Sequence, residues 1–275
     1  MKLNLDNKKL RALIPGVIHE VTGETSLYEK LSPWLETACW LLEQEIFDDY
    51  QPEGALYTLA EKIAVERAFA VAIPSLDVTL SPAGFAVINT DGRAPASKER
   101  VERLIASLTS SADANTVVLL DRLNRCKEWV ESPKGQWYRA TFLPDFNHLP
   151  KIEPGQLIFN VYRSVRSRAL MFEQEMAEHY LGRSFMATLR SSYPAFPTDG
   201  HREIYELIRS IELDFVRISG KCELPPDPNM CWHMVRPILA QLDYFPELKQ
   251  QWESEMGEKI KVEPFKNTAK GGFYF

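Results

Sequence analysis

The chain has 275 residues, of which 45% are hydrophobic and 25% charged, so it can bury a normal core and wholesale disorder is excluded. Its net charge of −6 gives no support for a nucleic-acid-binding protein, since such domains usually carry a basic surplus. No apolar run reaches the roughly 18 residues of a membrane span, and no apolar segment follows the basic N-terminus. We therefore expect neither membrane association nor a signal peptide.

The chain opens without regular apolar spacing, and we interpret residues 1–25 as an extended N-terminal arm. Ser26, followed three residues later by a glutamate, forms a capping-box signal and predicts a helix start. Apolar residues then recur at helical spacing as far as Ile46, and a second such pattern ends near Pro74. These elements open a first helical unit at residues 26–131.

Later in this unit, two short β-prone runs flank a Ser-Pro-Ala-Gly turn, so residues 78–88 predict a β-hairpin. One helix is expected at residues 97–108 and another at residues 112–130.

The rest of the chain repeats this order. Residues 132–153 are irregular and rich in proline, and we interpret them as a linker. A second helical unit should occupy residues 154–257, and residues 258–275 should form a C-terminal arm.

Internal similarity suggests that the two units are copies. Glu43-Gln44-Glu45 aligns with Glu173-Gln174-Glu175, at an offset of 130. Residues 101–108 resemble residues 235–242 at an offset of 134, and residues 216–224 offer a counterpart of the hairpin. The expected fold is mainly α: two tandem copies of a helical-bundle unit, each with a small β-hairpin, plus extended N- and C-terminal arms.

Catalytic motifs are missing from the sequence. It has no H-E-x-x-H, no C-x-x-C, no G-x-S-x-G and no phosphate-binding glycine loop. We predict that the protein is not an enzyme and uses no cofactor.

Two metal sites remain as alternatives. Cys222, Cys231 and His233 are close in sequence and could bind zinc, although a fourth ligand is not visible. A helical carboxylate-metal enzyme is the other alternative, with the following candidate ligands: Glu43, Glu45, Glu173, Glu175 and His179.

Two segments have the character of contact surfaces. Basic residues cluster around the expected helix start at Ser97. Near the C-terminus, aromatic residues follow a flexible glycine-containing stretch, and they favour docking because large apolar groups are unfavourable in water. The predicted partner-binding residues are Arg93, Lys98, Arg100, Phe265, Phe273, Tyr274 and Phe275.

Three stretches carry a resemblance to a known family: residues 13–21, 73–87 and 94–105. Together they resemble an uncharacterised family of Bacteroidetes phage and prophage proteins. The helical unit with arms and hairpin also looks like the head–tail connector adaptors of tailed phages. That resemblance implies a virion protein of the neck, assembled in the host cytoplasm as a ring of copies. Its partners would be the portal protein and a tail or neck protein, with DNA passing through without specific binding and no membrane involved.

Ring size stays open, because twelve subunits are the expectation for adaptors but six duplicated chains would present twelve similar units. A tail terminator or a cap component of a contractile injection system is an alternative virion role. Outside the virion, a helical regulatory or interaction protein is a third alternative.

Overall fold

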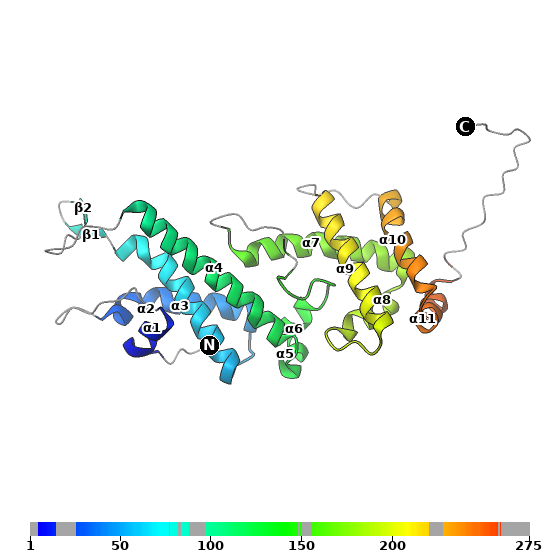
Figure 1. Cartoon of the computed structure of the whole chain (residues 1–275), viewed down its shortest axis with the longest axis horizontal. Coiled ribbons are helices and arrows are strands. Elements are labelled where there is room, and N and C mark those ends of the chain that lie inside the picture. The colour runs from blue at the N-terminus through cyan, green and yellow to red at the C-terminus, as the bar shows by residue number, and fades with distance from the viewer. Residues whose placement is uncertain are drawn as a thin grey trace, which may run out of the picture. The chain divides into compact units, whose positions relative to one another are not determined.

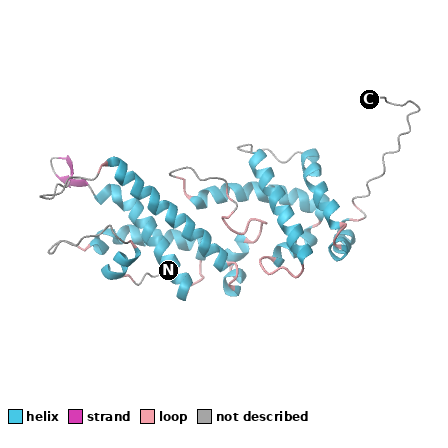
Figure 2. Cartoon of the chain, viewed as in Figure 1, coloured by secondary structure: helices cyan, strands magenta, loops and turns pink. Residues whose placement is uncertain are grey.

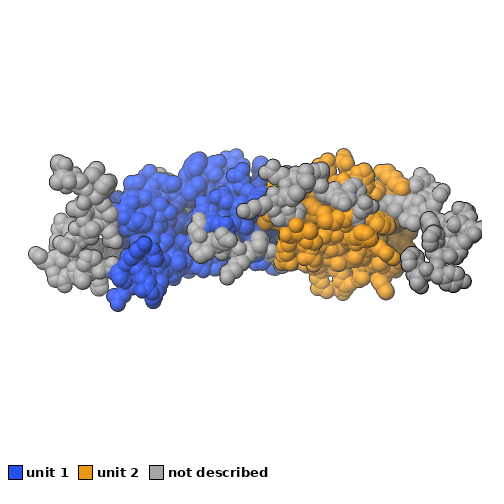
Figure 3. All heavy atoms as spheres, turned by 90° about the horizontal axis from the view of Figure 1, so that it is seen from above, with its two compact units in different colours: residues 1–140, 144–164 blue, residues 141–143, 165–275 orange. Residues whose placement is uncertain are grey.

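A computed structural model describes residues 5–14, 26–76, 78–81, 84–87, 97–147, 149, 156–219, 228–257 and 259. The described chain is mainly helical (Figure 2), which confirms the predicted fold class at that level. It divides into two compact units, shown in separate colours in Figure 3. Unit 1 comprises residues 1–140 and 144–164, and unit 2 comprises residues 141–143 and 165–275. Within the described ranges, no helix is both long and apolar enough to cross a membrane.

Unit 1 contains six helices, a π-helical turn and a two-stranded hairpin among its described residues (Figure 1). In chain order they are α1 (Asn7–Leu13), α2 (Leu27–Leu42), the π turn η1 (Glu43–Phe47), α3 (Gly54–Leu76), β1 (Val78–Ser81), β2 (Gly84–Val87), α4 (Lys98–Leu123), α5 (Lys127–Glu131) and α6 (Pro133–Tyr138).

The start of α2 follows directly from the sequence. The Oγ of Ser26 accepts a hydrogen bond from the Glu29 amide at 3.2 Å, and the Ser26 amide donates to Glu29 Oε2 at 3.2 Å. These two bonds satisfy amides that a helix start otherwise leaves without partners. The predicted capping box is confirmed.

The central element of unit 1 is α3, which packs against both α2 and α4. Small residues at four-residue spacing, from Ala60 through Ala64 and Ala68 to Ala72, are all buried, and Ile63 and Val65 are buried between them. A helix that is apolar on most sides belongs inside a bundle, because an exposed face would leave apolar surface in water. This pattern places α3 in the core.

The hairpin consists of antiparallel β1 and β2, in a register that pairs Val78 with Val87 and Leu80 with Phe85. It leads from α3 toward the segment before α4. Instead of the two helices expected at residues 97–108 and 112–130, a single helix α4 runs from Lys98 to Leu123. The reason is that residues 109–111, Thr-Ser-Ser, carry no helix-breaking residue, and Thr109 Oγ1 donates to the Ile105 carbonyl at 2.9 Å without ending the helix.

The prediction of an extended arm at residues 1–25 is wrong for its described part. Asp6 caps α1 through a 2.7 Å hydrogen bond from the Lys9 amide. Leu10 and Ile14, one turn apart, are both buried, so the helix is held by an apolar face. Lys9 Nζ also pairs with Glu61 Oε2 of α3 at 2.6 Å.

The predicted linker at residues 132–153 is also wrong in character, because it contributes a helix and core residues. Ser132 caps α6 by accepting from the Gly135 amide at 3.1 Å. Within unit 1, Tyr138 and Phe146 are buried, with ring centroids 6.1 Å apart. The aromatic residues between the prolines therefore fill a core.

Unit 2 consists of helices and one π turn in its described part: α7 (Ile158–Met176), whose residues up to 164 group with unit 1, the π turn η2 (Ala177–Leu181), α8 (Arg183–Ser192), α9 (Asp199–Ser219), α10 (Pro228–Leu242) and α11 (Pro246–Met256). Its core joins α7 to α9, where the rings of Phe172 and Phe215 stack at 4.5 Å between centroids. Both α8 and α10 pack against α9.

The second hairpin, expected at residues 216–224, is contradicted for its first four residues, which form the end of α9. Phe215 and Val216 are buried and extend the apolar face of Ile204 and Ile208, so helical packing prevails over local β-propensity. Residues 220–227 lie outside the described part. The C-terminal arm at residues 258–275 lies outside it as well, apart from Lys259.

Candidate functional site

The predicted partner-binding residues fall in two groups. Lys98 and Arg100 lie in the first turn of α4 and are exposed, with the Lys98 side chain 89% accessible and 3.7 Å from the Glu102 carboxylate. The remaining predicted residues lie outside the described ranges: Arg93, Phe265, Phe273, Tyr274 and Phe275.

The predicted zinc ligands do not come together where the structure describes them. Cys231 is fully buried on α10, whereas His233, two residues along the same helix, is exposed. Residues two apart on a helix point to different sides, so these two side chains face different surroundings. Cys222 lies outside the described residues.

The predicted carboxylate ligands are each engaged within their own unit. Glu45 pairs with Arg67, Glu173 pairs with Arg190, and Glu175 lies 3.8 Å from His179. Glu43 opens the π turn η1, where its carbonyl accepts from the Asp48 amide at 2.7 Å. Across the described residues, no group of three or more His, Cys, Asp or Glu side chains is arranged to hold a metal ion.

Unit 1 contains a buried polar junction, which we call junction 1 and define by Glu45, Arg67 and Thr116. Arg67 Nη1 donates to Glu45 Oε2 at 2.6 Å, and Arg67 Nη2 lies 3.5 Å from Thr116 Oγ1. Thr116 Oγ1 in turn donates to the Ala112 carbonyl at 2.7 Å. One guanidinium therefore balances one buried carboxylate and ties η1, α3 and α4 together.

A half-buried carboxyl borders junction 1. Burial raises the pKa of Asp113, the nearby positive charge of Arg67 lowers it, and the negative charge of Glu45 raises it again. The net result is a raised pKa for Asp113, whose charge is coupled to both members of the Glu45–Arg67 pair.

Unit 2 contains a second buried polar junction, junction 2, defined by Glu173, Arg190 and Glu212. Arg190 Nη1 donates to Glu173 Oε2 in a short hydrogen bond, and the Phe142 amide donates to Glu173 Oε1 at 2.8 Å. The Arg190 guanidinium also lies over the Phe142 ring, 5.7 Å from its centroid. Glu212 of α9 is fully buried beside this pair. One guanidinium here faces two carboxyl groups.

The arginines of both junctions and Glu212 were not among the sequence-predicted residues. A signal for Glu212 does exist, since it continues the buried face of α9 at four-residue steps after Ile204 and Ile208. A carboxyl group in the apolar stripe of a helix points to a buried polar interaction. Nothing local marks Arg67 or Arg190, because each meets its partner only through tertiary packing.

A tryptophan holds the π turn in each unit. The Trp129 indole N–H of α5 donates to the Ile46 carbonyl in η1 at 3.0 Å. The Trp252 indole N–H of α11 donates to the Tyr180 carbonyl in η2 at 2.9 Å. A π turn leaves a carbonyl outside the regular helical ladder, and the indole satisfies it.

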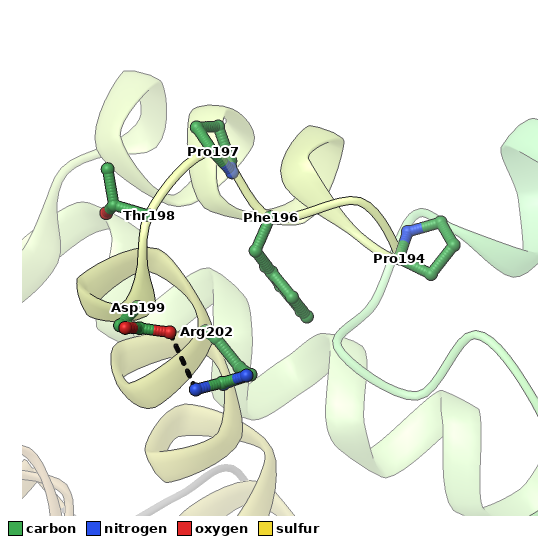
Figure 4. A pocket seen from close by; sticks show the side chains of 6 residues that line it. All are labelled: Pro194, Phe196, Pro197, Thr198, Asp199 and Arg202. Atoms are coloured by element: carbon green, nitrogen blue, oxygen red, sulfur yellow. Dashed lines mark hydrogen bonds and ion pairs between the residues drawn. The ribbon is translucent and has the colours of Figure 1, made fainter.

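An open pocket of about 510 Å³ lies on unit 2, in front of the N-terminus of α9 (Figure 4). Its lining residues are Pro194, Phe196, Pro197, Thr198, Asp199 and Arg202. Asp199 Oδ1 accepts from Arg202 Nη2 at 2.7 Å, so the two charges neutralise each other (Figure 4). The lining offers proline and aromatic surface, and the hydroxyl Oγ1 of Thr198 lies 2.8 Å from the ring nitrogen Nδ1 of the buried His201.

A family described as of unknown function (DUF6712) matches residues 18–139, less than half of the chain. The match takes in α2, α3, the hairpin and α4 of unit 1, and its description assigns no activity. No curated protein matches the chain. No solved structure matches it either.

Proposed function

We propose that the chain is a structural virion protein of a tailed phage, a head–tail adaptor that closes into a ring between portal and tail. The observation that favours a structural role is that buried carboxylates of this chain bind donors on other helices of the same unit. Glu45, Glu61 and Glu66 of unit 1 each bind donors from another element of that unit, and Glu173 of unit 2 does the same. Carboxylates committed in this way fix helices to one another, whereas a catalytic carboxylate must reach its substrate.

The phage assignment is supported by the stretches that resemble phage and prophage proteins. The family of unknown function overlaps these stretches, which lie mostly within residues 18–139. A net charge of −6 also suits a ring through which DNA passes without being bound. A ring built from identical chains requires heterologous contacts, in which one surface of a chain meets a different surface of the next.

The contact surface that supports this proposal is the first turn of α4. Lys98 and Arg100 are exposed there, within one of the stretches that resemble the phage family and within the residues that the family of unknown function matches. Exposed basic side chains steer association with an acidic partner and contribute little to the stability of their own fold. We assign this turn, together with Arg93 and the C-terminal aromatic residues, to contacts with neighbouring subunits and the portal.

Charge reversal at this turn tests the proposal. The double variant Lys98→Glu/Arg100→Glu should weaken binding to the phage's portal protein at least tenfold in a sedimentation or biolayer assay, a change of about 1.4 kcal/mol. Arg125→Glu/Lys127→Glu is the matched control, because it makes the same charge change at exposed residues of unit 1. Equal binding by the two variants, or no portal binding by the unmodified chain, would contradict the adaptor assignment.

We also infer that units 1 and 2 are tandem copies in a register with an offset of 134. In this register, buried Leu31, Leu35, Ala38 and Leu42 of α2 fall on Val165, Ala169, Phe172 and Met176 of α7, all of them buried. The π turns coincide as well, since η1 begins at Glu43 and η2 at Ala177.

The backbone after each π turn supports the same register. Asp48 and Gly182, which this register aligns, both have positive φ, of 53° and 89°. The carbonyls that accept the two tryptophan hydrogen bonds belong to Ile46 and Tyr180, and the register aligns these two residues as well.

The offset of 130 from the Glu-Gln-Glu match differs from this register by about one helical turn. It places η1 residues on the regular helix α7, so the shared tripeptide is not the structural equivalence. Neighbouring turns of one amphipathic helix share apolar spacing, which is why the wrong turn aligned.

A further inference from the structure

Junction 2 brings together three helices of unit 2 at a site that solvent barely reaches. Glu173 belongs to α7, Arg190 to α8 and Glu212 to α9. Glu212 has no exposed surface, and Glu173 is 3% exposed. In such surroundings a net charge is expensive, because neither water nor a counter-ion can solvate it.

The donors available at junction 2 serve only one of its two carboxyl groups. The Arg190 guanidinium and the Phe142 amide both donate to Glu173. As a carboxylate, Glu212 has no hydrogen-bond donor for either oxygen among the described residues. Two carboxylates side by side accept hydrogen bonds but donate none, so they repel each other unless one of them carries a proton.

The charged surroundings place that proton on Glu212. Burial, then the negative charge of Glu173 and a hydrogen bond with its carboxylate, raise the pKa of Glu212 far above its ordinary range, and Arg190 and Arg209 only partly oppose them. Burial also raises the pKa of Glu173, but less far than that of Glu212, because Arg190 and the Phe142 amide partly oppose the rise. Glu173 therefore stays the ionised partner of Arg190.

The other helix packed on α9 adds no opposing charge that faces Glu212. On α10, His233 and Arg236 are exposed, and neither is among the main causes of the raised pKa of Glu212. On α9 itself, Arg209 is shared with Glu206, to which it donates a short hydrogen bond.

We propose that Glu212 makes unit 2 a pH-sensitive element. While protonated, Glu212 donates a hydrogen bond to Glu173 and holds α9 to α7. When the proton is lost, two buried carboxylates compete for Arg190 and the packing of α7, α8 and α9 loosens. The proposal concerns the fold of unit 2 alone and does not depend on the adaptor assignment.

The direction of the pH effect follows from the raised pKa. In the unfolded chain Glu212 ionises in the ordinary glutamate range, whereas in the folded chain it keeps its proton to higher pH. The contribution of Glu212 to stability is complete below the ordinary range. It declines as pH rises from that range toward the folded-state pKa, and it changes no further above it.

Thermal unfolding of the full chain between about pH 5 and about pH 9 tests this, with Glu212→Gln as the variant. The amide keeps the shape and can donate to Glu173 but cannot ionise, so the melting temperature should fall with pH in the unmodified chain by on the order of 3 °C more than in the variant. Glu45→Gln is the matched control, because Glu45 has an arginine of its own, and it should keep the slope of the unmodified chain. Parallel profiles for the unmodified chain and Glu212→Gln would overturn the proposal.

A second measurement covers the case in which Glu212→Gln fails to fold. The infrared band of a protonated carboxylic acid should be present in the unmodified chain at neutral pH and retained in Glu45→Gln. Its absence from the unmodified chain would overturn the proposal. Peptide hydrogen exchange, compared at matched intrinsic rates, should show α7 to α9 losing protection at high pH while α2 to α4 of unit 1 do not.

Discussion

The two buried junctions solve the same packing problem with different charge balances. In junction 1, one carboxylate from η1 meets one arginine of α3, and that arginine also lies 3.5 Å from the Thr116 hydroxyl of α4. In junction 2, one carboxylate from α7 meets one arginine of α8, but Glu212 adds a second carboxyl group. The comparison contrasts two ways of holding helices together: a self-contained ion pair, and an ion pair whose charge balance depends on a proton.

The presence of a buried ion pair does not by itself mean that the pair makes the folded state more stable. Removing two charges from water costs several kcal/mol for each ion, which the attraction between them only partly offsets. The pair matters mainly because breaking it leaves one partner alone. Junction 2 should therefore be the more sensitive of the two, since Glu173 depends on Arg190 and the neighbouring Glu212 offers no compensating positive charge.

The largest expected effect comes from Arg190→Ala. It leaves Glu173 buried without its charged partner and should destabilise unit 2 by about 3–5 kcal/mol at neutral pH. Denaturant unfolding, monitored separately for each unit by hydrogen exchange, measures this loss of stability. Arg67→Ala is the corresponding change in unit 1, and it should cost less because junction 1 has one carboxylate and a neutral threonine. A larger loss from Arg67→Ala would reverse the proposed ranking.

The residues after the two π turns should respond with opposite signs. Gly182→Ala places a Cβ 2.5 Å from the Glu255 carboxyl, which caps α8 by accepting from the Ser184 and Phe185 amides. An alanine would also be strained at the φ of 89° found at this position. The free energy of unfolding of unit 2 should therefore fall by about 1–3 kcal/mol.

Asp48→Gly relieves a positive φ of 53° at an exposed residue and should stabilise unit 1 by about 0.4–1 kcal/mol. The melting temperatures of both variants check the signs. Two shifts in the same direction would show that the two positions are not equivalent.

Comparable effects are expected from the two tryptophans that bind the π turns. Trp252→Phe removes the hydrogen bond to the Tyr180 carbonyl and should cost about 0.5–1.5 kcal/mol. Trp129→Phe should cost more, about 1–3 kcal/mol, because Ile46 is buried and its carbonyl would lose its donor without gaining water. Equilibrium unfolding of the two single variants provides the test. A larger loss of stability in the Trp252 variant would contradict the argument that the buried Ile46 carbonyl of η1 depends more strongly on its donor.

Local signals in the sequence predicted the elements that depend on local chemistry. The capping box at Ser26 and the helical class of the chain are confirmed. The errors arose where tertiary contacts decide. The N-terminal arm became α1 because it can bury Leu10 and pair Lys9 with Glu61, and residues 216–219 joined α9 because its apolar face continues.

The buried junctions show the same limit for candidate functional residues. The sequence drew attention to Glu45 and Glu173, but as ligands of a metal, because the arginines that pair with them are distant in the chain. Arg67 and Arg190 lie 22 and 17 residues away from their partners. A pattern of residue types identifies a carboxylate that needs a partner, and only the packing of helices identifies which partner it has.

A cryo-electron microscopy map of the intact phage particle would test the central claim most directly. The account predicts a ring of this chain between portal and tail, with two helical units in every subunit and the start of α4 against a neighbour. A map that places the chain at the far end of the tail, in the capsid or outside the particle would contradict it.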